Sequence, residues 1–167
     1  MAELIQFQQF ADDLNVAEIT DESSLISFAH NHSVSFKVDS DSGLKVALSR
    51  LIFNLVPFDN AYVLALETGV WPSSELTELH TRLRASNGIH SSVLEAPFEK
   101  CSSQETSYLE CLCFCGLSFF WSFAIVFPEK PLIIYIDEDE WMGVCTPDPD
   151  LLKSIVADFK KYGLKKD

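Results

Sequence analysis

The feature that most constrains this fold is an uncharged stretch at residues 112–127, LCFCGLSFFWSFAIVF. A transmembrane helix needs about 20 apolar residues, and this stretch is shorter and lacks flanking Lys or Arg on its N-terminal side. We therefore expect it to be buried in a protein core, as the end of one helix, a break at Gly116 and a following strand. No membrane interaction is expected.

Hydrophobic periodicity in the rest of the chain predicts one domain over residues 1–167, in which helices and strands alternate. Helical spacing predicts helices at residues 3–14, 25–30, 44–56, 75–86 and 104–115, and one that begins near Pro149. Strand patterns occur at residues 34–38, 61–67, 122–127 and 132–136, and the last two are close enough for an antiparallel hairpin. The predicted fold is α/β (α+β), with a single layer of mixed, largely antiparallel sheet of about four strands packed against helices.

The balance of charge excludes several classes of partner. The chain has 25 acidic and 12 basic residues, for a formal net charge of -13. Such a charge repels phosphate backbones and anionic membranes, so nucleic acid is not an expected ligand. A basic protein is favoured instead, because opposite fields speed encounter. The alternative that acidity serves only solubility remains open.

Five cysteines, an odd number, and an N-terminus without a signal-peptide pattern predict a reducing compartment and a cytoplasmic location. Cys111, Cys113 and Cys115 lack the paired C-x-x-C spacing of a zinc site, so we interpret them as small buried apolar residues.

Other motifs do not indicate catalysis. Residues 39–43, DSDSG, depart from a calcium-binding loop, because the glycine comes one place early and Arg50 occupies the final ligand position. His30 and His32 would supply only two metal ligands. A Walker motif, a dinucleotide fingerprint and a nucleophile elbow are absent. We expect no enzyme activity, no metal and no cofactor.

The densest charge cluster is the best candidate for a binding surface. It comprises Asp137, Glu138, Asp139 and Glu140, followed directly by Trp141. The carboxylates could meet Lys and Arg of a partner, with Trp141 as an aromatic anchor. A solvated loop and a Mg²⁺ site are the other two interpretations, and a Mg²⁺ site would need further oxygen ligands from other loops.

A second group of residues carries a resemblance. Residues 69–75 read GVWPSSE, and further matches occur at residues 83–86, 88, 94–97 and 139–141. Over residues 58–145 the chain resembles a group of short bacterial proteins of unknown function, although Leu76 and Phe98 depart from that pattern. By class, such small acidic proteins resemble immunity proteins, which cover the active site of a toxin. Trp71 and Glu75 of this motif are therefore included in the predicted partner-binding surface.

The leading hypothesis is an acidic immunity- or antitoxin-like protein that binds and neutralises a basic toxin such as a nuclease. One alternative is a small enzyme that uses His80, Glu75 and Arg84, which lie on one predicted helix. Another is an assembly subunit, in which the Phe- and Trp-rich C-terminal half forms an apolar dimer surface. The sequence leaves the oligomeric state open.

Overall fold

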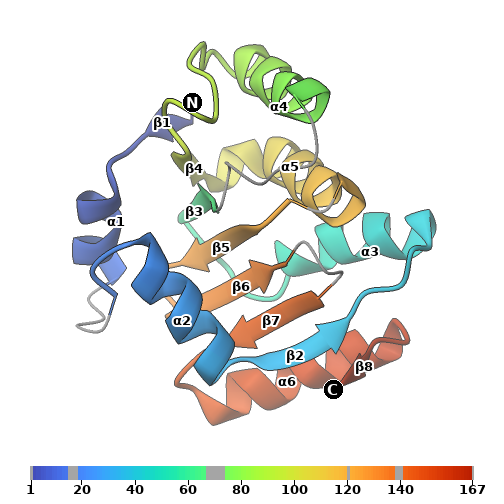
Figure 1. The fold of residues 1–167 in the computed structure, drawn as a ribbon. Coiled ribbons are helices and arrows are strands. Elements are labelled where there is room, and N and C mark those ends of the chain that lie inside the picture. The colour runs from blue at the N-terminus through green and yellow to red at the C-terminus, as the bar shows by residue number, and fades with distance from the viewer. Residues whose placement is uncertain (1, 15–18, 67–73, 120, 138–140, 167) are drawn as a thin grey trace.

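The computed structural model describes residues 2–14, 19–66, 74–119, 121–137 and 141–166 (Figure 1). The helices in these ranges are α1 (Phe7–Leu14), α2 (Glu22–His32), α3 (Ser42–Ile52), α4 (Ser74–Ser86), α5 (Thr106–Phe119) and α6 (Pro149–Lys161). The strands are β1 (Glu3–Leu4), β2 (Val34–Lys37), β3 (Asn60–Ala65), β4 (Phe98–Ser102), β5 (Phe123–Phe127), β6 (Leu132–Ile136), β7 (Trp141–Cys145) and β8 (Lys165–Lys166). A short 3₁₀ turn (Ser103–Glu105) joins β4 to α5.

All the described strands belong to one sheet, in the order β1-β4-β3-β5-β6-β7-β2-β8. Every neighbouring pair is antiparallel. The predicted α/β class and single sheet are confirmed, as is the β5–β6 hairpin, but the prediction of a mixed sheet is wrong, because the described strands pair only antiparallel. The predicted size of about four strands is wrong, because the sheet has eight strands. The two-residue strands β1 and β8 form its edges, and β4 and β7 are internal strands that the sequence patterns did not reveal.

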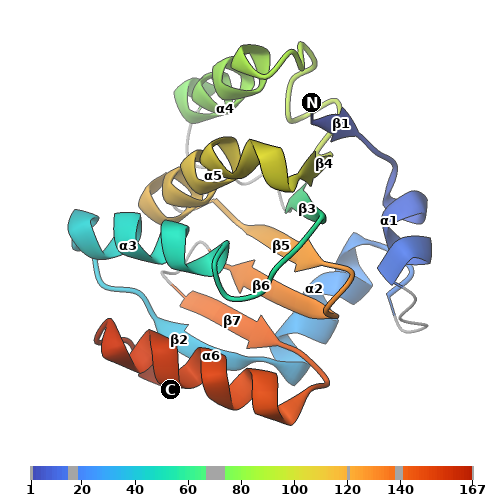
Figure 2. The same ribbon diagram turned by 180° about the vertical axis from the view of Figure 1, so that it is seen from behind.

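Helices cover both faces of the sheet. Figure 2 shows α3, α5 and α6 in front of one face, with α4 outside α5, and Figure 1 shows α1 and α2 on the other face. Each face has its own apolar cluster. In β5, for example, Ile125 belongs to the α3/α5/α6 cluster, and its neighbours Ala124 and Val126 belong to the α1/α2 cluster. A strand buried on both faces explains a run without polar alternation.

Side chains at the helix N-termini fix where several helices begin. The carboxylate of Asp41 accepts a hydrogen bond from the Leu44 N–H at 2.7 Å and starts α3. Asp148 caps α6 in the same way, with the expected Pro149 in the first turn. For α2 the cap is Asp21, and Ser24 completes a capping box three residues later.

Gly116 does not end a helix, contrary to prediction. Helix α5 continues through it to Phe119, and the glycine lies against the ring of Phe123 in β5. A Cβ at position 116 would overlap that ring, so the missing side chain allows close packing between helix and strand. Residues 112–127 therefore contain a longer helix end than expected, followed by the predicted buried strand. No helix in the described ranges is both long enough and apolar enough to cross a membrane.

Candidate functional site

The predicted acidic cluster lies where β6 is joined to β7. Asp137 follows the last residue of β6, and its N–H donates to the carbonyl of Trp141, the first residue of β7, at 2.8 Å. Both side chains are half-buried. The cluster members Glu138, Asp139 and Glu140 lie outside the described residues, as does Trp71. Glu75 lies in the first turn of α4, and its side chain is likewise outside the described part.

A row of side chains runs from Trp141 across the neighbouring strands. Trp141 is directly opposite Lys37 of β2, and Lys37 is opposite Lys165 of β8. Directly opposed residues project from the same face of a sheet. The Lys37 ammonium lies 5.7 Å from the centre of the Trp141 ring, within the range of a cation–π contact. Figure 1 shows that α2 crosses the sheet near the start of β2 and the end of β7. Trp141 and Lys37 lie at the opposite ends of these strands, where Trp141 is half-buried.

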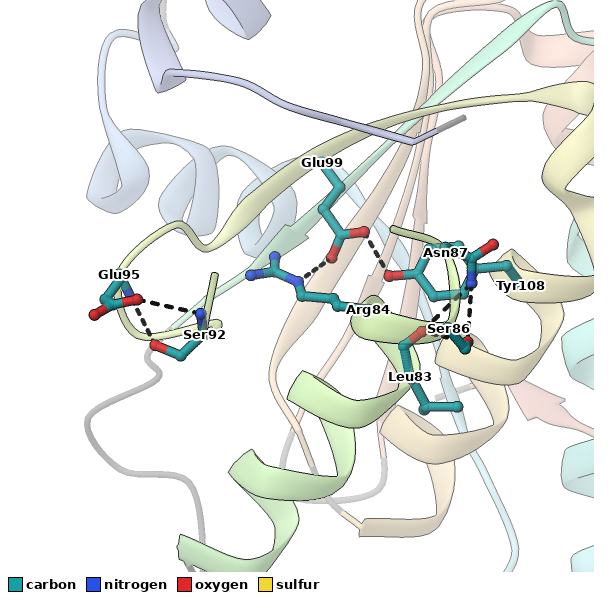
Figure 3. A network of polar contacts seen from close by, with 8 residues as sticks. All are labelled: Leu83, Arg84, Ser86, Asn87, Ser92, Glu95, Glu99 and Tyr108. Atoms are coloured by element: carbon teal, nitrogen blue, oxygen red, sulfur yellow. Dashed lines mark hydrogen bonds and ion pairs between the residues drawn. The ribbon is translucent and has the colours of Figure 1, made fainter. Parts of the chain in front are cut away.

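A buried polar network joins α4, β4 and α5 (Figure 3). The Nε of Arg84 donates to Oε1 of Glu99 at 2.6 Å, and the hydroxyl of Tyr108 donates to Oε2 of Glu99 at 2.6 Å. Arg84 and Glu99 are 0% and 1% exposed. Neither Glu99 nor Tyr108 belongs to a sequence motif that predicts a site. The sequence carried no clear signal for Glu99, because Phe98 and Cys101 are three residues apart and do not alternate as the apolar residues of one strand face do.

The two terminal nitrogens of Arg84 have no hydrogen-bond acceptor among the described residues. An unsatisfied buried donor costs about 1–3 kcal/mol, so this guanidinium has unused capacity for hydrogen bonding. Burial and the ion pair leave it inaccessible to a substrate. The burial of Tyr108 and the Glu99 carboxylate raise the pKa of the phenol well above its usual value, so Tyr108 stays a hydrogen-bond donor.

His80 lies one turn before Arg84 on α4 and is also buried, against the ring of Trp121 at 5.2 Å between ring centres. Burial, with a smaller contribution from the Arg84 charge, lowers the pKa of His80 to about 3. A cavity of about 10 Å³ beside it is lined by Leu112, Trp121 and other apolar residues, room for about one water. The predicted enzyme residues His80 and Arg84 are therefore both inside the protein, and the cavity beside His80 is too small for a substrate.

The cysteines follow the prediction in part. All five are free thiols; Cys101, Cys113, Cys115 and Cys145 are buried, whereas Cys111 is exposed. The interpretation as buried apolar residues is thus confirmed for Cys113 and Cys115 and wrong for Cys111. Among the side chains that the structure describes, no three His, Cys, Asp or Glu converge as metal ligands would.

Comparisons with known proteins add no further constraint. No protein-family model, no curated protein and no solved structure matches this chain.

Proposed function

We propose that this protein is an acidic immunity- or antitoxin-like inhibitor that acts in the cytoplasm by binding a basic protein toxin, such as a nuclease, and blocking its action. The observation that carries the proposal is the position of Trp141. It is a partly accessible aromatic side chain at the start of β7, directly after four consecutive acidic residues in a chain of net charge -13.

This arrangement suits a protein–protein contact for two reasons. Tryptophan is enriched among the residues that dominate binding energy at interfaces, where its ring fills a pocket on the partner. The adjacent carboxylates attract a basic surface from a distance and reject a wrong partner by like-charge repulsion. Strands β6 and β7, buried over most of their lengths, supply a rigid framework on either side of the acidic connection.

The first test is affinity purification of the tagged protein from its native host at about 50 mM salt, with mass spectrometry of the proteins that co-elute. We expect one stoichiometric basic polypeptide that is toxic when expressed alone. Its association rate should fall steeply as salt rises to about 500 mM, because screening weakens electrostatic steering. Recovery of only neutral or acidic partners, or an association rate that does not depend on salt, would overturn the proposal.

A double variant with reversed charge, compared with a matched control, tests where the contact lies. Glu138→Lys/Asp139→Lys should slow association with the recovered toxin by at least about tenfold. The matched control is Asp12→Lys/Glu95→Lys, which makes the same change in net charge at two exposed positions, on α1 and in the α4–β4 connection. If both variants slow association equally, the whole molecule's charge steers the encounter and the acidic connection is not the contact.

The other two functions have weaker support. The enzyme alternative would need His80 and Arg84 to reach a substrate, and both are buried. An assembly subunit would need a continuous apolar surface, whereas the large exposed apolar side chains of the described part lie on separate elements: Leu4 on β1, Val46 on α3, Leu94 before β4 and Tyr162 after α6.

A further inference from the structure

A groove with basic walls lies at the edge of the sheet where β2 and β8 end the strand order. It has a volume of about 350 Å³ and is lined by Lys37, Val38, Asp39, Ser40, Gly163 and Lys165. A cavity of this size is at the lower end of the range for small-ligand sites. The turn at Gly163, with φ of 84°, leaves open space beside the groove.

The two lysines of the groove are placed against each other. Lys37 and Lys165 are directly opposite in the β2–β8 ladder and both are exposed. No described carboxylate forms an ion pair with either ammonium. Like charges directly opposite each other destabilise a sheet. The chain has about twice as many acidic as basic residues, yet these two lysines lie side by side. This arrangement favours an anionic ligand, whose negative charge would offset the repulsion between the two ammonium groups.

We propose that this groove binds a phosphate group, held between the ammonium groups of Lys37 and Lys165. A phosphate dianion matches two cations in charge, and lysine binds phosphate as a point charge without a fixed geometry. The Trp141 ring beneath Lys37 limits the positions that this ammonium can take. Asp39 is the acidic residue of the lining, and its carboxylate accepts a hydrogen bond from the Ser40 hydroxyl at 3.3 Å. The phosphate therefore lies on the lysine side of the groove.

The chemistry limits the kind of phosphate. A net charge of -13 repels a long polyanion such as nucleic acid along much of the length of the polyanion. A single phosphate group is too small to meet that extended repulsion. The ligand is thus inorganic phosphate or the phosphate of a small organic monoester. The phosphate site borders the proposed toxin contact, because Lys37 packs against Trp141, but its test uses phosphate alone and needs no toxin.

The test is a titration of the full chain with inorganic phosphate and, separately, with phosphoserine, at constant ionic strength, followed by amide chemical shifts. We expect one saturable site in the millimolar range or tighter, with the largest shifts at Lys37, Ser40, Gly163 and Lys165. Binding should be tighter at pH 8 than at pH 6, because the second phosphate proton is lost near pH 6–7. Phosphoserine binding at least as tightly as inorganic phosphate would assign the site to an organic monoester; preference for inorganic phosphate would assign it to the free ion.

Matched variants identify the residues. Lys37→Ala/Lys165→Ala should weaken phosphate binding at least tenfold, whereas Lys130→Ala/Lys153→Ala, which removes the same charge from two exposed lysines elsewhere, should leave it within about twofold. Phosphate should also raise the unfolding temperature of the native protein and of the control, and leave that of the Lys37/Lys165 variant unchanged.

Three results would overturn the proposal. The first is the absence of saturation below about 10 mM phosphate. The second is an equal response to chloride at the same ionic strength, which would indicate screening only. The third is binding of a glutamate-rich peptide without binding of phosphate, which would identify the groove as a contact for an acidic protein segment.

Discussion

The guanidinium of Arg84 and the carboxylate of Glu99 form an ion pair at 2.6 Å inside the protein, with neither side chain more than 1% exposed. The pair connects α4 to β4, and the hydroxyl of Tyr108 extends the connection to α5. Burying either charged group alone would cost free energy, and the opposite charge of its partner offsets much of that cost. This relationship makes the position of α4 dependent on residues that are distant in sequence.

Breaking the ion pair should be strongly destabilising. Glu99→Gln leaves the Arg84 charge buried without a counter-charge, and we expect a loss of about 3–5 kcal/mol in the free energy of unfolding, measured with urea. The double variant Arg84→Met/Glu99→Gln removes both charges and keeps an acceptor for Tyr108, so it should lose much less. A single variant within about 1 kcal/mol of the native protein would show that the pair does not hold α4 in place.

Gly116→Ala should destabilise the protein by about 1–3 kcal/mol, because the added methyl group overlaps the ring of Phe123 and forces α5 away from β5. The shorter side chain of Phe123→Leu in the same protein should restore part of the loss. Gly43→Ala is the control: its new methyl group would meet the Asp41 carboxylate oxygen at 3.1 Å, on the exposed first turn of α3. Equal effects at the two glycines, measured by thermal unfolding, would contradict this packing.

His80 should make the protein less stable in mild acid. Its pKa is about 3 in the fold and near 6.5 in the unfolded chain, so between these values the unfolded state binds one more proton at this residue. Stability from a neutral, buried His80 is present above pH 6.5 and falls as the pH drops toward 3. Between pH 7 and pH 5 the loss attributable to His80 is about 2 kcal/mol. His80→Leu should reduce the pH dependence of urea unfolding by that amount, and an unchanged dependence would contradict a buried neutral imidazole.

Thiol labelling distinguishes Cys111 from the other cysteines. Burial raises the pKa of Cys115 to about 11 and raises those of Cys101, Cys113 and Cys145, so these residues lack the reactive thiolate and access to reagent. Brief treatment with iodoacetamide near pH 8 should therefore add one group to the native protein, at Cys111, and five after unfolding in urea. Rapid native labelling at Cys113, read by peptide mass spectrometry, would disagree with the buried position of that thiol.

Trp141→Ala should raise the dissociation rate of the toxin complex and cost about 2 kcal/mol or more of binding energy, if Trp141 is the anchor that the proposed function requires. Trp141→Phe should retain part of the affinity, because the ring area is reduced and not removed. Surface plasmon resonance with the recovered toxin measures both rates. If the complex of the Trp141→Ala variant dissociated at the same rate as that of the native protein, the contact would have to lie elsewhere on the surface.

Much of the secondary structure was predictable because its signals are local. The apolar spacing of α3, α5 and α6 lies within each helix, and the branched and aromatic residues of β3, β5 and β6 identify them as buried strands. Strand β4, FEKCS, gave no such signal, because Glu99 occupies an inward position where an apolar residue is expected. Strand β7 was missed because it contains Gly143 and directly follows the acidic run, which resembles a loop.

The sequence alone determined the α/β class, the buried strand at residues 123–127, the β5–β6 hairpin and the excess of negative charge, since each depends on composition or on neighbours a few residues apart. Only the tertiary structure decided that Gly116 lies within a helix, that Arg84 meets Glu99 and Tyr108, and that Lys37 lies between Trp141 and Lys165. The relationships of Arg84 and Lys37 join segments that are far apart along the chain, and that of Gly116 depends on how α5 packs against β5. Their energies come from close packing and from charge compensation away from water, which no local pattern of residues encodes.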